Sequence, residues 1–186
     1  LVNQIIGEKV VIVSDRPQTT RRAIRGIAMR GQTQLVMVDL PGFQRPRDLL
    51  TERMQRRVER ELSESDAVLF VLNGEEGVGA GDRFIAALLK ESSKPVLIAV
   101  NKGDRLNRSR TMTSLLAAEE LGLDAEIFPI SAKTGEGVEP LVARLAELMP
   151  EGPLLFGVDD LSDQPLAIEL AELIREWYGW HFPEMH

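Results

Sequence analysis

The sequence has no cysteine and only two histidines among its 186 residues. The missing cysteines exclude disulfide bonds, thiolate metal sites and cysteine nucleophiles. Both histidines, His181 and His186, lie within the last six residues, so we expect no zinc site or acid–base chemistry built on histidine in the body of the protein. Any chemistry must rest on backbone amides, carboxylates, hydroxyls, lysine and arginine.

Long apolar runs are also missing. No run approaches the roughly 20 residues that cross a bilayer, and no signal peptide is visible, so a cytoplasmic location is expected. Residues 1–60 carry 12 Lys and Arg against 6 Asp and Glu, whereas the remainder carries 10 against 23. A basic face near the start could meet phosphate, but the net charge of −7 disfavours a stand-alone nucleic-acid binder.

Strand-like and helix-like segments alternate along the chain, which is typical of an α/β layer fold. Continuous apolar runs at 67–72 and 95–100 are typical of parallel strands covered on both faces. Besides an opening helix that ends at Gly7, the pattern predicts strands at 23–29, 34–39, 67–72, 95–100 and 125–130, and helices at 51–62, 81–91, 113–121, 138–149 and 164–178. Residues 150–163 contain proline and glycine and are interpreted as a linker.

The segment Asn101-Lys102-Gly103-Asp104 directly follows the expected strand 95–100. Ligands of open parallel sheets bind beyond the carboxyl ends of the strands, so polar residues are well placed here. The Asp104 carboxylate could accept two hydrogen bonds, from the ring N–H and the exocyclic amine of guanine, a donor pair that adenine lacks. Lys102 could cover one face of the purine with its aliphatic stem. A helix-capping loop is the alternative for this motif alone.

The next expected strand is followed by Ser131-Ala132-Lys133 and then by Thr134-Gly135-Glu136-Gly137. Backbone N–H groups of such a loop could bind the carbonyl oxygen of a purine, and Lys133 could cover the base from its other side. A plain turn with a left-handed glycine is the alternative. The order of strand, Asn-Lys-x-Asp, helix, strand and Ser-Ala-Lys favours a guanine site.

Two further motifs suit a phosphate and Mg²⁺. Asp39-Leu40-Pro41-Gly42 ends the strand 34–39, where a carboxylate can hold a Mg²⁺-bound water and the Gly42 N–H can reach a terminal phosphate. Thr19 and Thr20 lie in the polar loop Arg16 to Arg21, where a threonine hydroxyl can bind Mg²⁺ when the γ-phosphate is present. Taken singly, the first motif is equally compatible with a common turn, and the second is better explained as an ordinary polar loop.

Together these motifs resemble the translation-factor-related GTPases and, within them, the Era GTPases, over roughly residues 1–176. The matching segments are Gly7-Glu8-Lys9-Val10, Ser14 to Arg21, Asp39 to Gly42, Asn101 to Asp104, Phe128 to Lys133, Met149 to Pro153 and Ser162 to Pro165. The resemblance implies a Ras-like P-loop α/β fold, with a mostly parallel sheet and helices on both faces.

The resemblance also implies site residues and partners. Asn101, Lys102, Asp104, Ser131, Ala132 and Lys133 would hold guanine, Thr20 would bind Mg²⁺, and Asp39 and Gly42 would belong to a second switch, with Asp39 reaching Mg²⁺ through water. The ligands would be GTP or GDP with Mg²⁺. The partner would be small-subunit ribosomal RNA on the 30S subunit during ribosome assembly, reached through a KH domain, with peripheral association at the inner membrane as a further implication. No residue is assigned as catalytic.

The printed sequence departs from that family pattern at both ends. It holds no G-x-x-x-x-G-K-[ST] phosphate loop, which we expect directly before Leu1 together with the central strand of the sheet. Residues 175–184 resemble a signature of Nop-domain proteins rather than the entry to a KH domain. We therefore predict a fragment with a truncated GTPase domain at 1–149, a linker at 150–163, and a C-terminal helix at 164–186 that begins a missing domain.

Two alternatives stay open at this point. One is a non-catalytic interaction module or GTPase remnant that cannot bind nucleotide, because the phosphate loop is absent from the sequence. The other is a different ribosome-assembly or tRNA-modifying GTPase, against which the segment Ser162 to Pro165 argues.

Overall fold

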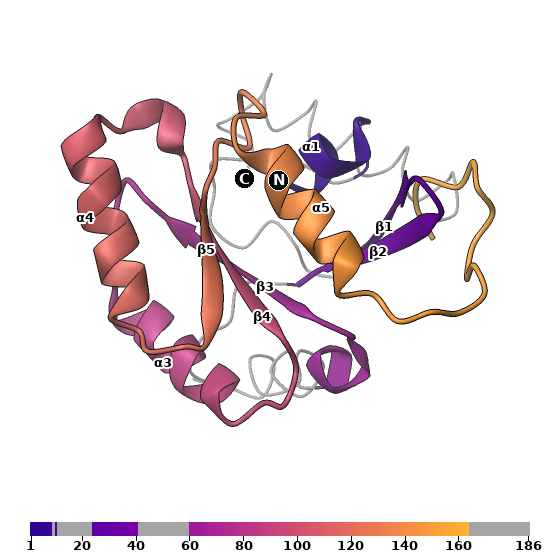
Figure 1. Ribbon diagram of the computed structural model, residues 1–186, viewed down its shortest axis with the longest axis horizontal. Coiled ribbons are helices and arrows are strands. Elements are labelled where there is room, and N and C mark those ends of the chain that lie inside the picture. Colours follow the sequence, from indigo (N-terminus) through magenta and orange to yellow (C-terminus); the bar gives the residue numbers. More distant parts are fainter. Residues whose placement is uncertain (9, 11–23, 41–59, 164–186) are drawn as a thin grey trace, which may run out of the picture.

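The computed structural model describes residues 1–8, 10, 24–40 and 60–163. Its elements, in chain order, are α1 Val2–Ile6, β1 Ile24–Arg30, β2 Thr33–Asp39, β3 Val68–Asn73, α3 Ala80–Lys90, β4 Val96–Asn101, a 3₁₀ turn η1 Gly103–Arg105, α4 Arg108–Glu119, β5 Ala125–Pro129 and α5 Val138–Glu147 (Figure 1). Of the predicted helices, 164–178 and all but the last turn of 51–62 lie outside the described residues. Among the helices that are described, none is long and apolar enough to cross a membrane.

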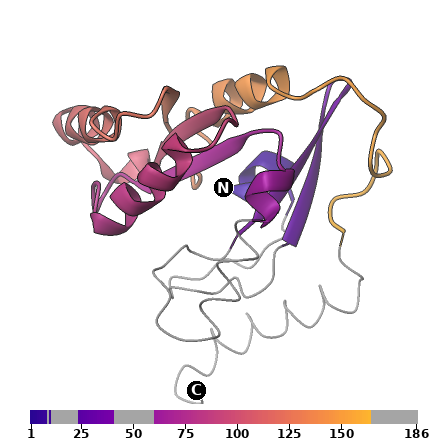
Figure 2. The same ribbon diagram turned by 90° about the horizontal axis from the view of Figure 1, so that it is seen from below.

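A three-stranded parallel sheet in the order β3-β4-β5 carries the core. Its central strand β4 is buried from Val96 to Val100. Side chains of successive strand residues point to opposite faces. Leu97 and Ala99 therefore join one apolar cluster, with α5, α1 and the β1-β2 hairpin, whereas Ile98 and Val100 join another, with α3 and α4. Helices thus cover both faces of this sheet, as Figures 1 and 2 show.

Strands β1 and β2 form a separate antiparallel hairpin, with Ile27 opposite Val36. In the described part of the chain β2 pairs only with β1, and β3 only with β4. The expectation that 67–72 is covered on both faces is wrong at Val71, which is 42% exposed. The physical reason is that Val71 lines a cavity of about 1450 Å³ between the hairpin and the parallel sheet.

Helix α4 begins five residues earlier than the predicted 113–121. The Asn107 side chain accepts a hydrogen bond from the backbone N–H of Arg110 at 2.9 Å. Asparagine is among the strongest residues at this capping position, because its side chain satisfies an N–H group that lacks a partner within the helix. The Asn107 cap therefore allows the helix to begin at Arg108, ahead of the predicted start.

The predicted linker 150–163 has no regular helix or strand, but it is attached along the hairpin. The Ile27 N–H donates to the Leu161 carbonyl at 2.9 Å. The Gln34 side chain accepts from the N–H groups of Leu155 and Phe156 and donates to the Phe156 carbonyl, at 2.9 to 3.0 Å. We call residues 150–163 the strap, because backbone hydrogen bonds and one glutamine hold it against β1 and β2.

Candidate functional site

The loops that follow β4 and β5 meet at one edge of the parallel sheet. The two strands are neighbours and run in the same direction, so their carboxyl ends lie together. The Gly103 N–H donates to the Ile130 carbonyl at 2.9 Å. A Cβ atom at position 103 would lie 3.0 Å from the same carbonyl oxygen, so the close approach of the two loops favours glycine.

Asn101 joins both of these loops to the end of β3. Its side-chain Oδ1 accepts a hydrogen bond from the Ala132 N–H at 2.9 Å. Its backbone carbonyl accepts from the Gly74 N–H at 3.0 Å. The structure thus gives Asn101 a bracing role that the sequence interpretation, which grouped it with the base-binding residues, did not foresee.

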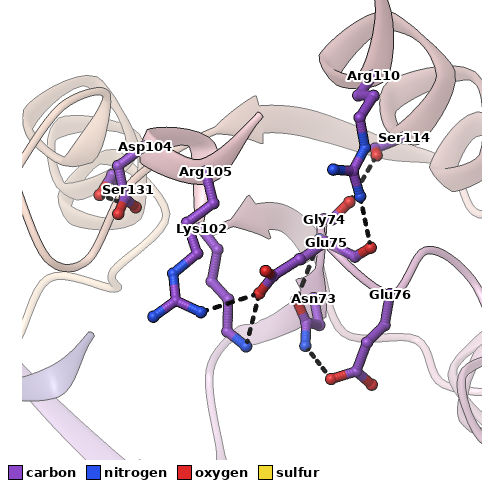
Figure 3. A network of polar contacts seen from close by, with 10 residues as sticks. All are labelled: Asn73, Gly74, Glu75, Glu76, Lys102, Asp104, Arg105, Arg110, Ser114 and Ser131. Carbon is purple, nitrogen blue, oxygen red and sulfur yellow. Dashed lines mark hydrogen bonds and ion pairs between the residues drawn. The ribbon is translucent and has the colours of Figure 1, made fainter. Parts of the chain in front are cut away.

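Asp104 and Ser131 lie against each other where the two loops meet (Figure 3). We call the part of the cavity lined by Lys102, Asp104, Ala132 and Lys133 the slot. The Ser131 hydroxyl donates to Asp104 Oδ1 at 2.6 Å and accepts from the Thr134 N–H at 3.1 Å. Ser131 is buried, whereas Asp104 is exposed. The hydrogen bond from Ser131 is the main cause that lowers the pKa of Asp104, and the charges of Lys133 and Arg105 lower this pKa further. Asp104 is therefore an ionised acceptor at neutral pH.

Lys102 has an unusual backbone for its residue type. Its φ of 68° lies in the left-handed region, and it is the one described non-glycine residue with a positive φ. This conformation costs an L-residue about 1–2 kcal/mol. Its Nζ lies 3.5 Å from Oε2 of Glu75. Sequence reasoning missed Glu75, although the rule that sites form beyond strand ends points to the residues after β3 as well.

Among the predicted phosphate and Mg²⁺ residues, only Asp39 lies within the described part of the chain, whereas Thr20 and Gly42 lie outside it. Asp39 ends β2 and lines the same cavity as Asn101, Lys102, Asp104 and Lys133. A carboxylate in that place suits a Mg²⁺-bound water. The described residues contain no group of three or more His, Cys, Asp or Glu side chains that could hold a metal by themselves.

A family model described as "50S ribosome-binding GTPase" matches residues 1–102, which is more than half of the chain. The chain belongs to this GTPase family. GTPase Era of Nocardioides sp. is 46% identical over 182 residues, and GTPase Era of Streptomyces coelicolor is 42% identical over 182 residues. Each alignment covers 95% of this chain and 58% or 57% of the relative.

Solved structures agree with the family. The crystal structure of Era in complex with MgGDPNP and nucleotides 1506–1542 of 16S ribosomal RNA has a TM-score of 0.85 at 31% identity and covers 94% of this chain and 60% of its own. A variant of Aquifex aeolicus Era bound to GDP·AlF₄⁻ has a TM-score of 0.84, also at 31% identity, with the same shares covered.

The resemblance to the Era GTPases and the Ras-like α/β fold with a parallel sheet are therefore confirmed. The chain spans somewhat under two thirds of the length of these relatives.

Proposed function

We propose that this family member is the nucleotide-binding part of a GTP-hydrolysing switch of the Era type. The observation that carries the proposal is that the ionised Asp104 carboxylate, oriented by the Ser131 hydroxyl, lines one cavity with Ala132 and Lys133 of the loop after β5. Guanine would offer two donors to such a carboxylate and its carbonyl oxygen to that loop. Adenine would leave the charge unpaired, and sites of this kind discriminate by about 10⁴-fold.

The proposed roles of the site residues follow from their positions. Asp104 would accept the hydrogen bonds of the base, and Ser131 would hold the Asp104 carboxylate in place. The loop that contains Ala132 would bind the carbonyl oxygen of guanine. Lys102 and Lys133 contribute the two faces of the slot. Asn101 braces the slot by its bond to the Ala132 N–H.

The proposed switch lies on the β2 side of the cavity. Asp39 would hold Mg²⁺ through water, Thr20 would bind Mg²⁺ directly, and Gly42 would contact the γ-phosphate. GTP would supply the γ-phosphate that orders these loops together with Mg²⁺, and the loss of this phosphate on hydrolysis would release them. No side chain is proposed as a catalytic base, so hydrolysis would depend on positioning and charge neutralisation.

The partners of the whole protein are proposed from its relatives. A structure of Era contains a segment of 16S ribosomal RNA, which supports a role in assembly of the small ribosomal subunit through an RNA-binding KH domain outside the 186 residues. We also propose that the protein works in the cytoplasm and associates peripherally with the inner membrane. The boundaries 1–149, 150–163 and 164–186 remain the proposed domain division.

The experiment uses nucleosides, which test the base slot separately from any phosphate site. The ¹⁵N-labelled chain is titrated with guanosine, adenosine and xanthosine and followed by NMR. We expect guanosine alone to shift the amides of 101–105 and 131–137. The Asp104→Asn variant should prefer xanthosine to guanosine. An amide donates a hydrogen bond where the carboxylate accepted one, and xanthine has a carbonyl in place of the amine of guanine.

Asp124→Asn is the matched control, since Asp124 is exposed and precedes β5 at the opposite edge of the sheet. Equal shifts with adenosine and guanosine, or an unchanged preference in the Asp104 variant, would show that the slot does not read guanine.

A non-catalytic interaction module is the alternative to the switch. Fluorescent GTP with and without Mg²⁺ distinguishes the two functions. Mg²⁺-dependent binding supports the switch, whereas guanosine binding without any gain from phosphate or Mg²⁺ supports the module.

A further inference from the structure

Glu75 occupies a firmly held turn beside the base slot (Figure 3). Its N–H donates to Oδ1 of Asn73 at 3.1 Å, and its carbonyl accepts from Arg110 of α4 at 3.0 Å. The preceding residue is also fixed, because the Gly74 carbonyl accepts from the buried Ser114 hydroxyl at 2.9 Å. The backbone of Glu75 is thus tied to α4, and its side chain starts from a defined place.

One carboxylate oxygen of Glu75 contacts two cations of the loop after β4. Oε2 lies 3.5 Å from Lys102 Nζ and 3.2 Å from Arg105 Nη1. Among the described residues, neither cation has another ion-pair partner. The exposed fractions of the three side chains are 35% for Glu75, 40% for Lys102 and 54% for Arg105. The contact therefore lies at the rim of the slot, where salt can weaken it.

The contact sets the direction in which Lys102 points. The Lys102 side chain runs toward the end of β3, whereas Asp104 points to Ser131 on the other side of η1 (Figure 3). An unpaired lysine ammonium would move among many rotamers. With its ammonium held at Glu75, the aliphatic stem of Lys102 is confined to one side of the slot.

We propose that Glu75 is a positioning residue of the base slot, which holds Lys102 and Arg105 so that the Lys102 stem forms one wall for a purine. The inference rests on the proposed guanine function and adds a residue to it. Glu75 acts on how tightly a purine is covered, because a lysine stem packs on any purine face. It does not act on which purine is chosen, because that choice belongs to Asp104.

The test compares Glu75→Gln with Glu76→Gln in the 186-residue chain. Glu76 is the adjacent residue of the same type, and its carboxylate accepts from the Asn73 amide rather than from a cation. Without any ligand, the Glu75 variant should shift the Lys102 and Arg105 side-chain NMR signals and the amides of 102–105, and the Glu76 variant should not. Unchanged signals at 102–105 would overturn the proposal whether or not a nucleoside binds.

Guanosine titration then measures the consequence for binding. We expect Glu75→Gln to weaken guanosine binding about two- to fivefold, the range of a partly exposed ion pair. The preference for guanosine over adenosine should stay the same. Salt at about 1 M should bring the wild type to the affinity of the variant, because it screens the ion pair that the variant lacks. A purely structural role of Glu75 predicts no such convergence.

The remaining outcomes separate this proposal from the proposed function. If the wild type does not bind guanosine, or if the Asp104→Asn variant keeps the preference of the wild type for guanosine, the proposed function is wrong. Guanosine binding that is equal or tighter in Glu75→Gln defeats the positioning role alone. Repeating Glu75→Gln in an Arg105→Gln background identifies the route, because the loss persists there if Glu75 acts through Lys102.

Discussion

The Ser131 hydroxyl donates a 2.6 Å hydrogen bond to the Asp104 carboxylate across 27 residues of sequence. One residue is buried at the end of β5, and the other is exposed in the turn after β4. Because the donor is held by its own loop, the carboxylate is oriented before any ligand arrives. A preformed acceptor loses less conformational entropy on binding than a freely rotating one.

Ser131→Ala should raise the pKa of Asp104 toward its ordinary value, because the main cause of the lowered pKa is removed. Because the pKa of Asp104 is lowered in the folded protein, the stability that this carboxylate contributes is present above the ordinary pKa and is lost as the pH falls through the folded-state pKa. The carboxyl ¹³C shift of Asp104, followed during acid titration, measures the change. Ser109→Ala, on the exposed first turn of α4, is the control. An unmoved midpoint in the Ser131 variant would contradict the assignment.

Lys102→Gly should be more stable than Lys102→Ala by about 1 kcal/mol, because glycine adopts a positive φ without steric cost. The order should reverse at Thr113, an exposed position within α4 where glycine is the poorer residue by about the same amount. Urea unfolding of the two pairs of variants measures both differences. Equal stabilities at position 102 would mean that the backbone there does not occupy the left-handed region.

Gln34→Ala should release the strap near Leu155 and Phe156, since one side chain makes three hydrogen bonds to their backbone. Each such bond contributes about 0.5–1.5 kcal/mol. Amide hydrogen exchange of the Leu155 and Phe156 N–H groups should become faster, while exchange in β4 stays slow. Gln32→Ala, an exposed glutamine in the hairpin turn, serves as the control. Unaltered exchange at 155 and 156 would show that Gln34 does not hold the strap.

Leu141→Ala should lower the free energy of unfolding by about 2–5 kcal/mol, because Leu141 is fully buried in the cluster between α5 and the sheet. Leu116→Ala should change it by less than about 0.5 kcal/mol, because that side chain is 54% exposed on α4. Urea unfolding at one protein concentration compares the two variants. Similar losses for both would contradict the placement of the core on the α5 face.

The sequence alone determined the alternation of strands and helices and the two loops that form the slot. Apolar runs and strand-end motifs are local signals, because each depends only on residues that are neighbours in the sequence. This is why Asp104 and Ser131 could be named as partners of one site before their distance was known, and why the turn that ends α1 at Gly7 was predicted correctly.

Only the tertiary structure decided how the slot is braced and held. Asn101 turns its amide toward the Ala132 N–H, and Glu75 meets Lys102, a residue 27 positions away. The folding of the strap over Gln34 joins residues 121 or more positions apart. No local pattern records such contacts, because an exposed glutamate or glutamine reads as a solvated side chain until the packing of distant elements brings a partner within reach.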